Sequence, residues 1–189
     1  MSRYYFIINA PPLSFSKSEL YQQNLKINSM GSFIKAISDA FFLSNQFRRK
    51  NFVYYCTKYK NTPYIITFDG ETLKYLGPSF FSAAHLLLRA KNHIKDSKSK
   101  SGKLTPGLSV HKKGVDWILE KHTKDAWINV IKDDIITEIH PSDNLESSVV
   151  FFYNFEDKTQ NHKTINMSLG PLDIDEQVIL TNYFIESLV

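Results

Sequence analysis

Apolar residues recur along the chain in short runs rich in aromatic and β-branched side chains, separated by turn residues. Such runs predict strands, because these side chains suit a pleated, half-buried surface. The predicted strands cover residues 4–8, 52–56, 64–68, 108–111, 126–131 and 149–153. Asp69-Gly70 is a hairpin signal, so we expect residues 71–76 to form the return strand beside 64–68.

Longer segments carry apolar residues at helical spacing. Phe33, Ile34, Ile37 and Phe41 form one core-facing stripe along the first of these segments. The predicted helices cover residues 31–43, 79–94, 115–121 and 176–188. Because strands alternate with helices, the pattern predicts an α/β fold with a mainly parallel sheet and helices on both faces.

Two polar stretches interrupt this pattern. Residues 13–30 begin with a Ser-rich segment, and residues 95–104 are basic and of low complexity, so both are predicted to be loops. The run Val149–Tyr153 is instead continuously apolar, which is typical of a strand covered on both faces.

The chain length and composition favour one domain. With 189 residues, 42% of them hydrophobic, the chain can bury one sizeable core, whereas two domains would have two small ones. We therefore expect a single domain over residues 1–189. Cys56 is the single cysteine, so no internal disulfide is possible. The first apolar run reaches Asn9 too early for a signal peptide or membrane helix, so we expect a cytoplasmic protein without a membrane span.

The charge and the absent motifs narrow the chemistry. Lys and Arg outnumber Asp and Glu by 23 to 19, a mild excess that suits a polyanionic partner without proving one. The sequence contains no glycine-rich phosphate loop, no zinc-type spacing of Cys or His, and no nucleophile elbow. Kinase, metalloenzyme and common hydrolase functions are therefore disfavoured, and we expect no metal ligands.

A basic cluster follows the first predicted helix. That helix ends near Ser44, and Arg48, Arg49 and Lys50 come shortly after it. Cations suit the negative end of a helix dipole, whereas the paired donors of Arg also match phosphate oxygens. From this segment alone, the role at the helix end is the simpler interpretation, and a phosphate-binding cluster is the alternative.

Two strand-end segments form a second candidate site. The strand Val149–Tyr153 enters the acidic loop Asn154–Asp157, and Met167–Pro171 precedes the last helix. In open α/β sheets, ligands bind beyond the carboxyl ends of the strands. Two ordinary connections would show the same pattern, so both interpretations stay open at this point.

Four blocks of the chain occur in the order found in one protein family. They are Ser38–Arg49, Phe68–Pro78, Thr105–Val110 and Ile165–Pro171, followed by Asn182-Tyr183 on the last helix. Together they resemble the archaeal tRNA pseudouridine N1-methyltransferases, a branch of the SPOUT superfamily. The resemblance covers nearly the whole chain, and its first two blocks are long and specific.

The resemblance implies an α/β fold whose C-terminal segment is threaded into a trefoil knot, with S-adenosylmethionine bound in the knot. It implies methyl transfer to N1 of the T-arm pseudouridine in tRNA. It also implies a homodimer, which the large apolar faces of helices 31–43 and 176–188 would support. The N1 atom of pseudouridine keeps a proton, so the protein must hold N1 in line with the methyl group and help the proton leave.

The resemblance also assigns roles to individual residues. Asp39 is the candidate to orient the base or accept the proton, and its alternative is a solvent-facing helix residue or a contact at the helix end. Arg48, Arg49 and Lys50 would hold tRNA phosphates, which gives affinity without sequence choice. Three strand-end segments would wall the cofactor pocket. Its expected residues are Ile131, Asn154, Phe155, Ser168, Leu169, Gly170 and Leu172.

Two family motifs differ in this chain. The Gly-Arg-x-Asp motif is replaced by Gly31–Ile34, and the Gly-Asp-His motif after the apolar strand is replaced by Asn154-Phe155-Glu156. Asn154 suits unusual backbone angles, but Phe155 puts a large ring where the family has a small acidic side chain, so we expect weak cofactor affinity. Two hypotheses follow: a tRNA methyltransferase, or a degenerate, non-catalytic homologue that binds RNA or a protein partner as a dimer.

Overall fold

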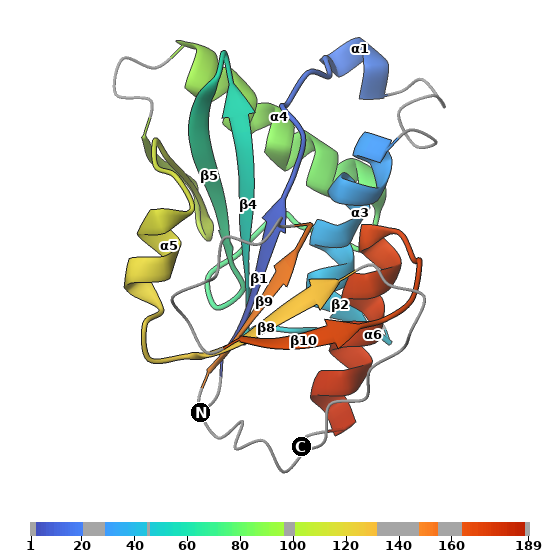
Figure 1. Ribbon diagram of the computed structural model, residues 1–189. Coiled ribbons are helices and arrows are strands. Elements are labelled where there is room, and N and C mark those ends of the chain that lie inside the picture. The colour runs from blue at the N-terminus through green and yellow to red at the C-terminus, as the bar shows by residue number, and fades with distance from the viewer. Residues whose placement is uncertain are drawn as a thin grey trace.

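The computed structural model describes residues 3–20, 29–44, 46–96, 101–131, 148–154 and 164–187 of the chain. Its helices are α1 (Lys17–Leu20), α3 (Ser29–Phe41), α4 (Phe80–Asp96), α5 (Asp116–Lys121) and α6 (Ile174–Ser187). Its strands are β1 (Tyr4–Asn9), β2 (Phe42–Leu43), β3 (Gln46–Phe47), β4 (Asn51–Tyr59), β5 (Thr62–Asp69), β6 (Gly102–Thr105), β7 (Leu108–His111), β8 (Ala126–Ile131), β9 (Val149–Tyr153) and β10 (Thr164–Ser168). Strands and helices alternate along much of the chain (Figure 1).

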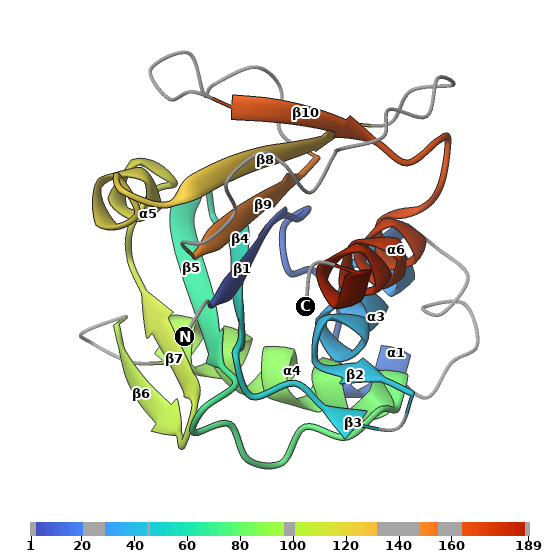
Figure 2. The ribbon, with the colours of Figure 1, turned by 90° about the horizontal axis from the view of Figure 1, so that it is seen from below.

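Eight strands form one sheet in the order β10-β8-β9-β1-β4-β5-β7-β6. The strands from β10 to β4 pair in parallel, whereas β5, β7 and β6 extend the sheet in antiparallel pairs. Figure 2 shows α5 on one face of the sheet and α3, α4 and α6 on the other. The predicted α/β fold is therefore confirmed, with the parallel pairing concentrated in one half of the sheet.

The sheet buries an apolar layer on each face. Phe6 and Ile8 of β1 belong to the larger cluster, which includes α3, α4 and α6. Tyr5 and Ile7 belong to a smaller cluster beneath α5. This division follows from the alternation of side chains along a strand. In β9 all five residues of Val149–Tyr153 are fully buried, as expected for a strand covered on both faces.

The predicted hairpin at Asp69-Gly70 is wrong, and residues 71–76 form no strand. The Asp69 carboxylate accepts hydrogen bonds from the Glu71 N–H at 3.0 Å and the Thr72 hydroxyl at 3.1 Å. These bonds close a compact turn at the end of β5, which is a common role for Asp in loops. The chain therefore leaves the sheet at a point where the dipeptide signal predicted a return.

The hairpin of this region instead joins β4 to β5 through Lys60 and Asn61. Both residues have positive φ angles, 48° for Lys60 and 61° for Asn61. Two successive positive φ angles are what a tight two-residue hairpin turn requires. Because Lys is not a typical residue at such a position, the local sequence pattern indicated this hairpin only weakly.

Further elements differ from the sequence prediction. The predicted helix 31–43 ends at Phe41, and Phe42–Leu43 pairs with Gln46–Phe47 as the short strands β2 and β3. No strand was predicted at residues 164–168, but β10 pairs in parallel with β8 and forms one edge of the sheet. Helix α1 lies within the segment 13–30, and strand β6 lies within the segment 95–104, both predicted to be loops. Pairing with a distant strand stabilises short strands such as β6 and β10, and local sequence does not report it.

The predicted trefoil knot depends on the connections around β9. Residues 132–147 and 155–163, which join β8 to β9 and β9 to β10, lie outside the described residues. The knot therefore stays a prediction. Among the described helices, none is long and apolar enough to cross a membrane.

Candidate functional site

The carboxyl ends of three parallel strands lie in one row at the edge of the sheet. Ser168, the last residue of β10, pairs with Ile131, the last residue of β8. Val130 pairs with Tyr153 of β9, so the next residue, Asn154, comes beside Ile131. Because neighbouring strands lie about 4.8 Å apart, the three strand ends fall within about 10 Å of one another. The fold thus brings together the three segments expected to wall the cofactor pocket.

Asn154 joins this row to the end of β1. Its φ angle is 60°, in the left-handed region that Asn tolerates better than most side chains, as its residue type predicted. The Asn154 Nδ2 donates to the carbonyl oxygen of Asn9 at 2.9 Å, and the Asn9 Nδ2 donates to the carbonyl oxygen of Asn154 at 2.9 Å. These reciprocal bonds hold the backbone of Asn154 in place where β9 ends.

Gly170 follows the end of β10 and has an unusual backbone conformation. Its φ angle is 87°, and a Cβ atom added to it would meet no described atom within 4 Å. This conformation favours glycine, whose backbone is buried here. Ser168 is also buried, whereas Leu169 and Leu172 are half-buried and leave apolar surface on either side of Gly170. Phe155 lies outside the described residues.

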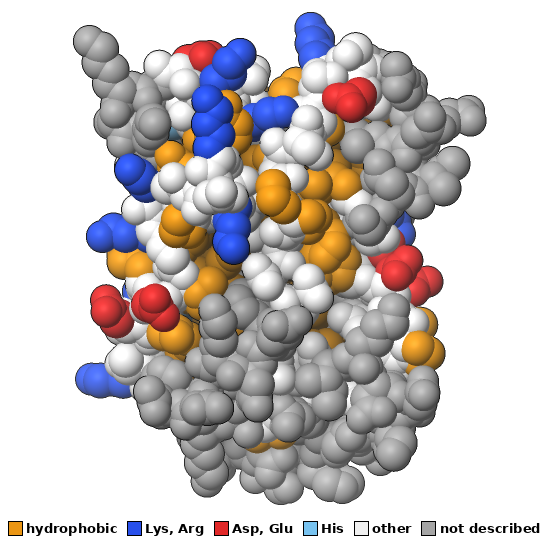
Figure 3. Space-filling model, turned by 45° about the horizontal axis from the view of Figure 1, so that its top comes forward, with side chains coloured by type: hydrophobic (Ala, Val, Ile, Leu, Met, Phe, Trp, Pro, Cys, Tyr) orange, Lys and Arg blue, Asp and Glu red, His pale blue; other side chains and the backbone are white. Residues whose placement is uncertain are grey.

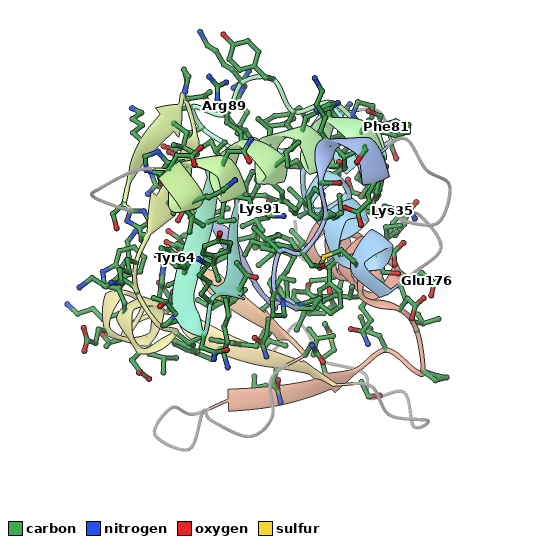
Figure 4. The ribbon with its side chains drawn as sticks, turned by 90° about the horizontal axis from the view of Figure 1, so that it is seen from above. Lys35, Tyr64, Phe81, Arg89, Lys91 and Glu176 are labelled. Atoms are coloured by element: carbon green, nitrogen blue, oxygen red, sulfur yellow. The ribbon has the colours of Figure 1, made fainter. Side chains whose placement is uncertain are left out.

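Asp39, the candidate proton acceptor, lies on α3 against α6, and its side chain is only 17% exposed. Lys35 Nζ donates to Asp175 Oδ2 at 2.7 Å and lies 3.7 Å from Asp39 Oδ2. Burial raises the pKa of Asp39 to about 6, although the Lys35 charge opposes this rise. Figure 4 shows Lys35 on the same side of the molecule as Glu176, in the first turn of α6.

Asp39 is therefore not a solvent-facing helix residue. Its position against α6 agrees with the other interpretation, a contact near the end of the helix. A carboxyl group with a pKa near neutrality is also suited to exchange a proton at physiological pH. Lys35, which tunes this group, was not a candidate from the sequence. Its partner Asp175 lies 140 residues away, so no local pattern could have indicated the pair.

Two buried amides connect the same helices to the sheet. The Asn51 Nδ2 donates to the Ala40 carbonyl oxygen at 2.5 Å and to the Asn182 Oδ1 at 3.1 Å. The Asn182 Nδ2 donates to the Asp39 carbonyl oxygen at 2.8 Å. These bonds satisfy carbonyl groups at the end of α3, where no further helical turn is available to do so. They fix the end of α3 against α6 and β4 at the backbone of Asp39 and Ala40.

The predicted RNA-binding residues form the turn between β3 and β4. The Arg48 guanidinium pairs with the Glu186 carboxylate near the end of α6. The Arg49 guanidinium lies 5.5 Å from the centre of the Phe47 ring, and Lys50 is exposed. Part of the Arg48 charge is thus compensated within the chain, whereas Arg49 and Lys50 keep their charges at the surface.

This basic turn borders a hollow of about 620 Å³. Besides the three cations, its lining includes Tyr4 at the start of β1 and Ile185 on α6. The turn lies at the amino end of β1, because Tyr4 pairs with Asn51. The strand-end row lies at the opposite end of these strands, about 20 Å away for a six-residue strand. Within one chain, the structure does not bring the two predicted sites together.

These features define an α/β protein in which the carboxyl ends of parallel strands lie side by side, the position where open α/β sheets bind ligands. Among solved structures with this fold is that of Nep1 from Archaeoglobus fulgidus, bound to S-adenosylhomocysteine. The match has a TM-score of 0.61 and 12% sequence identity, and it covers 99% of this chain and 98% of that chain. At this identity the likeness establishes the fold.

No protein-family model matches the chain, and no curated protein sequence matches it either. Within the described ranges, the structure holds no group of three or more His, Cys, Asp or Glu residues arranged to bind a metal ion.

Proposed function

We propose that this protein is an S-adenosylmethionine-dependent RNA methyltransferase whose cofactor binds at the carboxyl edge of β8, β9 and β10. The observation that carries this proposal is the row of Ile131, Asn154 and Ser168, with the left-handed Gly170 beside it. Ligands of open α/β sheets bind at such an edge. The Nep1 structure, which shares the fold, holds S-adenosylhomocysteine.

The described residues of this edge fit the cofactor in two respects. The absence of a side chain at Gly170 leaves its backbone groups free of a Cβ that would shield them from a purine edge, and the half-buried Leu169 and Leu172 offer apolar surface to the purine faces. We propose Ile131, Asn154, Phe155 and Ser168 as the remaining pocket residues, of which Phe155 lies outside the described part of the chain. When bound, the cofactor supplies a methyl group on a sulfonium centre, which is already activated for transfer.

We propose N1 of the T-arm pseudouridine in tRNA as the methyl acceptor. The task of the chain is to hold N1 in line and to accept its proton, which is mainly proximity and orientation with a modest acid–base contribution. Asp39 is the proposed acceptor, because burial raises its pKa to about 6 and Lys35 stabilises its ionised form. The modified nucleotide leaves its stack to reach the pocket.

The proposed assembly is a cytoplasmic homodimer on tRNA. Leu180 and Tyr183 of α6 are 39% and 53% exposed and are proposed to contribute apolar surface to the subunit contact. Arg49 and Lys50 are the surface cations proposed to bind tRNA phosphates. Because they lie about 20 Å from the strand-end row of their own chain, we propose that they serve the site of the partner subunit.

The alternative function is a non-catalytic homologue that binds RNA or a protein partner. The position of Asp39 where α3 packs on α6 favours this alternative, because its contact with Lys35 at 3.7 Å accounts for the carboxylate without a substrate. Loss of the Gly-Asp-His and Gly-Arg-x-Asp motifs also favours it. The two functions differ in one property, the binding and use of the methyl donor.

Calorimetry with S-adenosylmethionine, followed by transfer of a labelled methyl group to pseudouridine-containing tRNA, separates the two. We expect measurable binding that is weaker than micromolar, and methylated tRNA. Gly170→Val should abolish binding, because a β-branched side chain disfavours the positive φ angle and adds bulk beside the proposed pocket. Gly77→Val is the matched control, since its nearest neighbour is a Ser82 side chain 3.8 Å away. If no heat of binding is detected at millimolar S-adenosylmethionine, the methyltransferase function is excluded and the non-catalytic function is supported.

A further inference from the structure

A groove of about 430 Å³ opens at the carboxyl end of β1, on the face that carries α5. One wall comes from the residues that follow β1, a second from the β4–β5 hairpin, and a third from the segment that leads into α5. Its lining residues include Asn9, Pro12, Lys58, Asn61, Pro63 and Lys113. The groove lies outside the strand-end row and outside the hollow at Arg48.

The rim of the groove is cationic. Lys58 and Lys113 line it from opposite walls and are exposed, and Lys60 and Lys112 adjoin them in the chain. Among the described residues, neither Lys58 nor Lys113 forms an ion pair, in contrast to Lys35 and Arg48. Figure 3 turns the top of the molecule toward the viewer, and Lys and Arg side chains lie across the upper half of this view with fewer acidic side chains among them.

The floor of the groove differs from its rim. The exposed Pro12 and Pro63 contribute apolar surface above the buried Ile65, and the exposed Asn61 amide adds one acceptor and two donors. Cations above an apolar floor match a nucleotide, whose phosphates are anionic and whose base has an apolar face. Single-stranded RNA offers such unstacked bases, whereas a duplex keeps its base faces covered.

The groove adjoins the proposed cofactor edge directly. Asn9 lines the groove, and its side chain and carbonyl oxygen both bond to Asn154. Asn9, Asn154 and Ile131 lie at the carboxyl ends of three neighbouring strands, β1, β9 and β8, so the groove begins about 10 Å from the end of β8. A strand of RNA held in the groove would therefore lead to the place where methyl transfer is proposed.

We propose that this groove binds a single-stranded segment of the RNA substrate, with Lys58 and Lys113 on its phosphates and an unstacked base on the floor. The inference rests on the proposed function, which it deepens by naming the surface that guides RNA to the cofactor edge. It assigns the main RNA contact of one subunit to the carboxyl side of the sheet, away from the Arg48 turn.

The test compares Lys58→Ala/Lys113→Ala with a matched control, Lys17→Ala/Lys95→Ala, which removes the same charge from exposed positions on α1 and α4. Fluorescence anisotropy with a labelled T-arm RNA measures affinity over a range of salt concentrations. The slope of log affinity against log salt is negative, and each lost phosphate contact should reduce its magnitude by about 0.7. We expect the magnitude to fall by about 1.4 for the groove variant and to change little for the control. Lys58→Arg/Lys113→Arg should keep the wild-type slope.

Two different failures can be told apart. A wild-type protein that binds and methylates RNA, with equal slopes for the groove variant and the control, would overturn the groove and leave the proposed function intact. A wild-type protein that binds no RNA would overturn both. Ultraviolet crosslinking of the same RNA should map to peptides from 56–65 or 112–115, and crosslinks confined to 46–50 would also overturn the groove.

Discussion

At the scale of single residues, the contact between α3 and α6 places two carboxylates around one lysine. Lys35 donates to Asp175 at 2.7 Å but lies 3.7 Å from Asp39, so the charge of Asp39 is incompletely compensated. Burial raises the pKa of Asp39 from 3.8 to about 6. Because the folded state favours the protonated carboxyl, this group lowers the free energy of unfolding as the pH rises from 3.8 to about 6.

We expect Asp39→Asn to raise the free energy of unfolding near neutral pH by about 1–2 kcal/mol, since the amide needs no charge compensation. Urea denaturation at about pH 4 and about pH 7.5 measures the effect, which should be small at the lower pH. Asp175→Asn should instead destabilise at neutral pH, because it removes the short bond to Lys35. Equal effects of Asp39→Asn at both pH values would contradict the burial argument. If Asp39 accepts the substrate proton, the variant also loses methyl transfer but keeps cofactor binding.

A buried histidine, His122, changes the free energy of unfolding with pH in the direction opposite to Asp39. The His122 Nδ1 lies 2.6 Å from Asp125 Oδ2, and its Nε2 lies 3.1 Å from the Tyr54 hydroxyl. Burial lowers the pKa of His122 from 6.5, although the hydrogen bond to Asp125 opposes this change. The unfolded chain therefore takes up the proton first. The stability contribution is complete above pH 6.5 and is lost as the pH falls below it.

We predict that acidification below pH 6.5 destabilises the Asp39→Asn variant. In the wild-type protein, the opposite pH dependence of the Asp39 carboxyl offsets that of His122, and the substitution removes this offset. Adding His122→Gln should flatten this dependence, because glutamine keeps a donor and an acceptor without titrating near that pH. Thermal unfolding between about pH 5 and about pH 7.5 provides the measurement. An unchanged slope in the double variant would show that other groups carry the pH dependence.

Sequence could predict some of these residues because their chemistry is local. The left-handed backbone of Asn154 follows from its residue type and its place after an apolar strand. Its partner Asn9 lies 145 residues away, so the reciprocal amide bonds depend on the fold. The same limit applies to Lys35 and its partner, whose pairing tunes the candidate proton acceptor.

At the scale of elements, strands β7, β8 and β9 begin and end at the residues that the sequence predicted. Each is a short apolar run with turn residues on both sides, so its signal is local. Strand β10 was missed because its neighbour β8 stabilises it from across a long connection. The false hairpin at Asp69 has a physical cause as well, since its carboxylate binds the next turn instead.

That turn also explains one glycine. Gly107, between β6 and β7, has a φ angle of 75°, and its carbonyl oxygen accepts the Asp69 N–H at 2.8 Å. A Cβ atom at Gly107 would lie 2.2 Å from the Leu73 Cα, which is backbone and cannot move aside cheaply. The two loops therefore pack at a distance that only glycine permits.

Gly107→Ala should lower the free energy of unfolding by more than about 2 kcal/mol, because left-handed strain adds to a backbone clash. Gly77→Ala is the control, since its nearest neighbour is a Ser82 side chain 3.8 Å away. Chemical denaturation of both variants gives the comparison. Similar midpoints for the two would mean that the loops separate without cost.

At the scale of the whole molecule, the apolar helix faces that suggested a dimer are largely used within the chain. Ile34 and Ile37 of α3, and Val178 and Ile185 of α6, are buried in one core cluster. Leu180 and Tyr183 remain exposed on α6. A homodimer would thus depend on a smaller apolar surface than the sequence indicated.

We predict a dimer at micromolar concentration in analytical ultracentrifugation. Leu180→Ser combined with Tyr183→Ser should shift the protein toward monomer without unfolding it, because both side chains are exposed. Lys17→Ser is a control at an exposed position on α1. Sedimentation of the wild-type protein as a monomer throughout this range would remove the dimer from the proposed assembly.

The position of β1 between β4 and β9 also sets an order of assembly during translation. Tyr4 pairs with Asn51 of β4 on one side and with Val149 of β9 on the other. Of these two neighbours of β1, β9 is synthesised much later. At about 5–20 residues per second, the ribosome needs about 7–30 s to make the 145 residues from Tyr4 to Val149. During that time β1 has an open edge, the part of a sheet most prone to pairing with other chains. The nascent chain is therefore most exposed to misassembly, and to chaperone binding, just before β9 emerges.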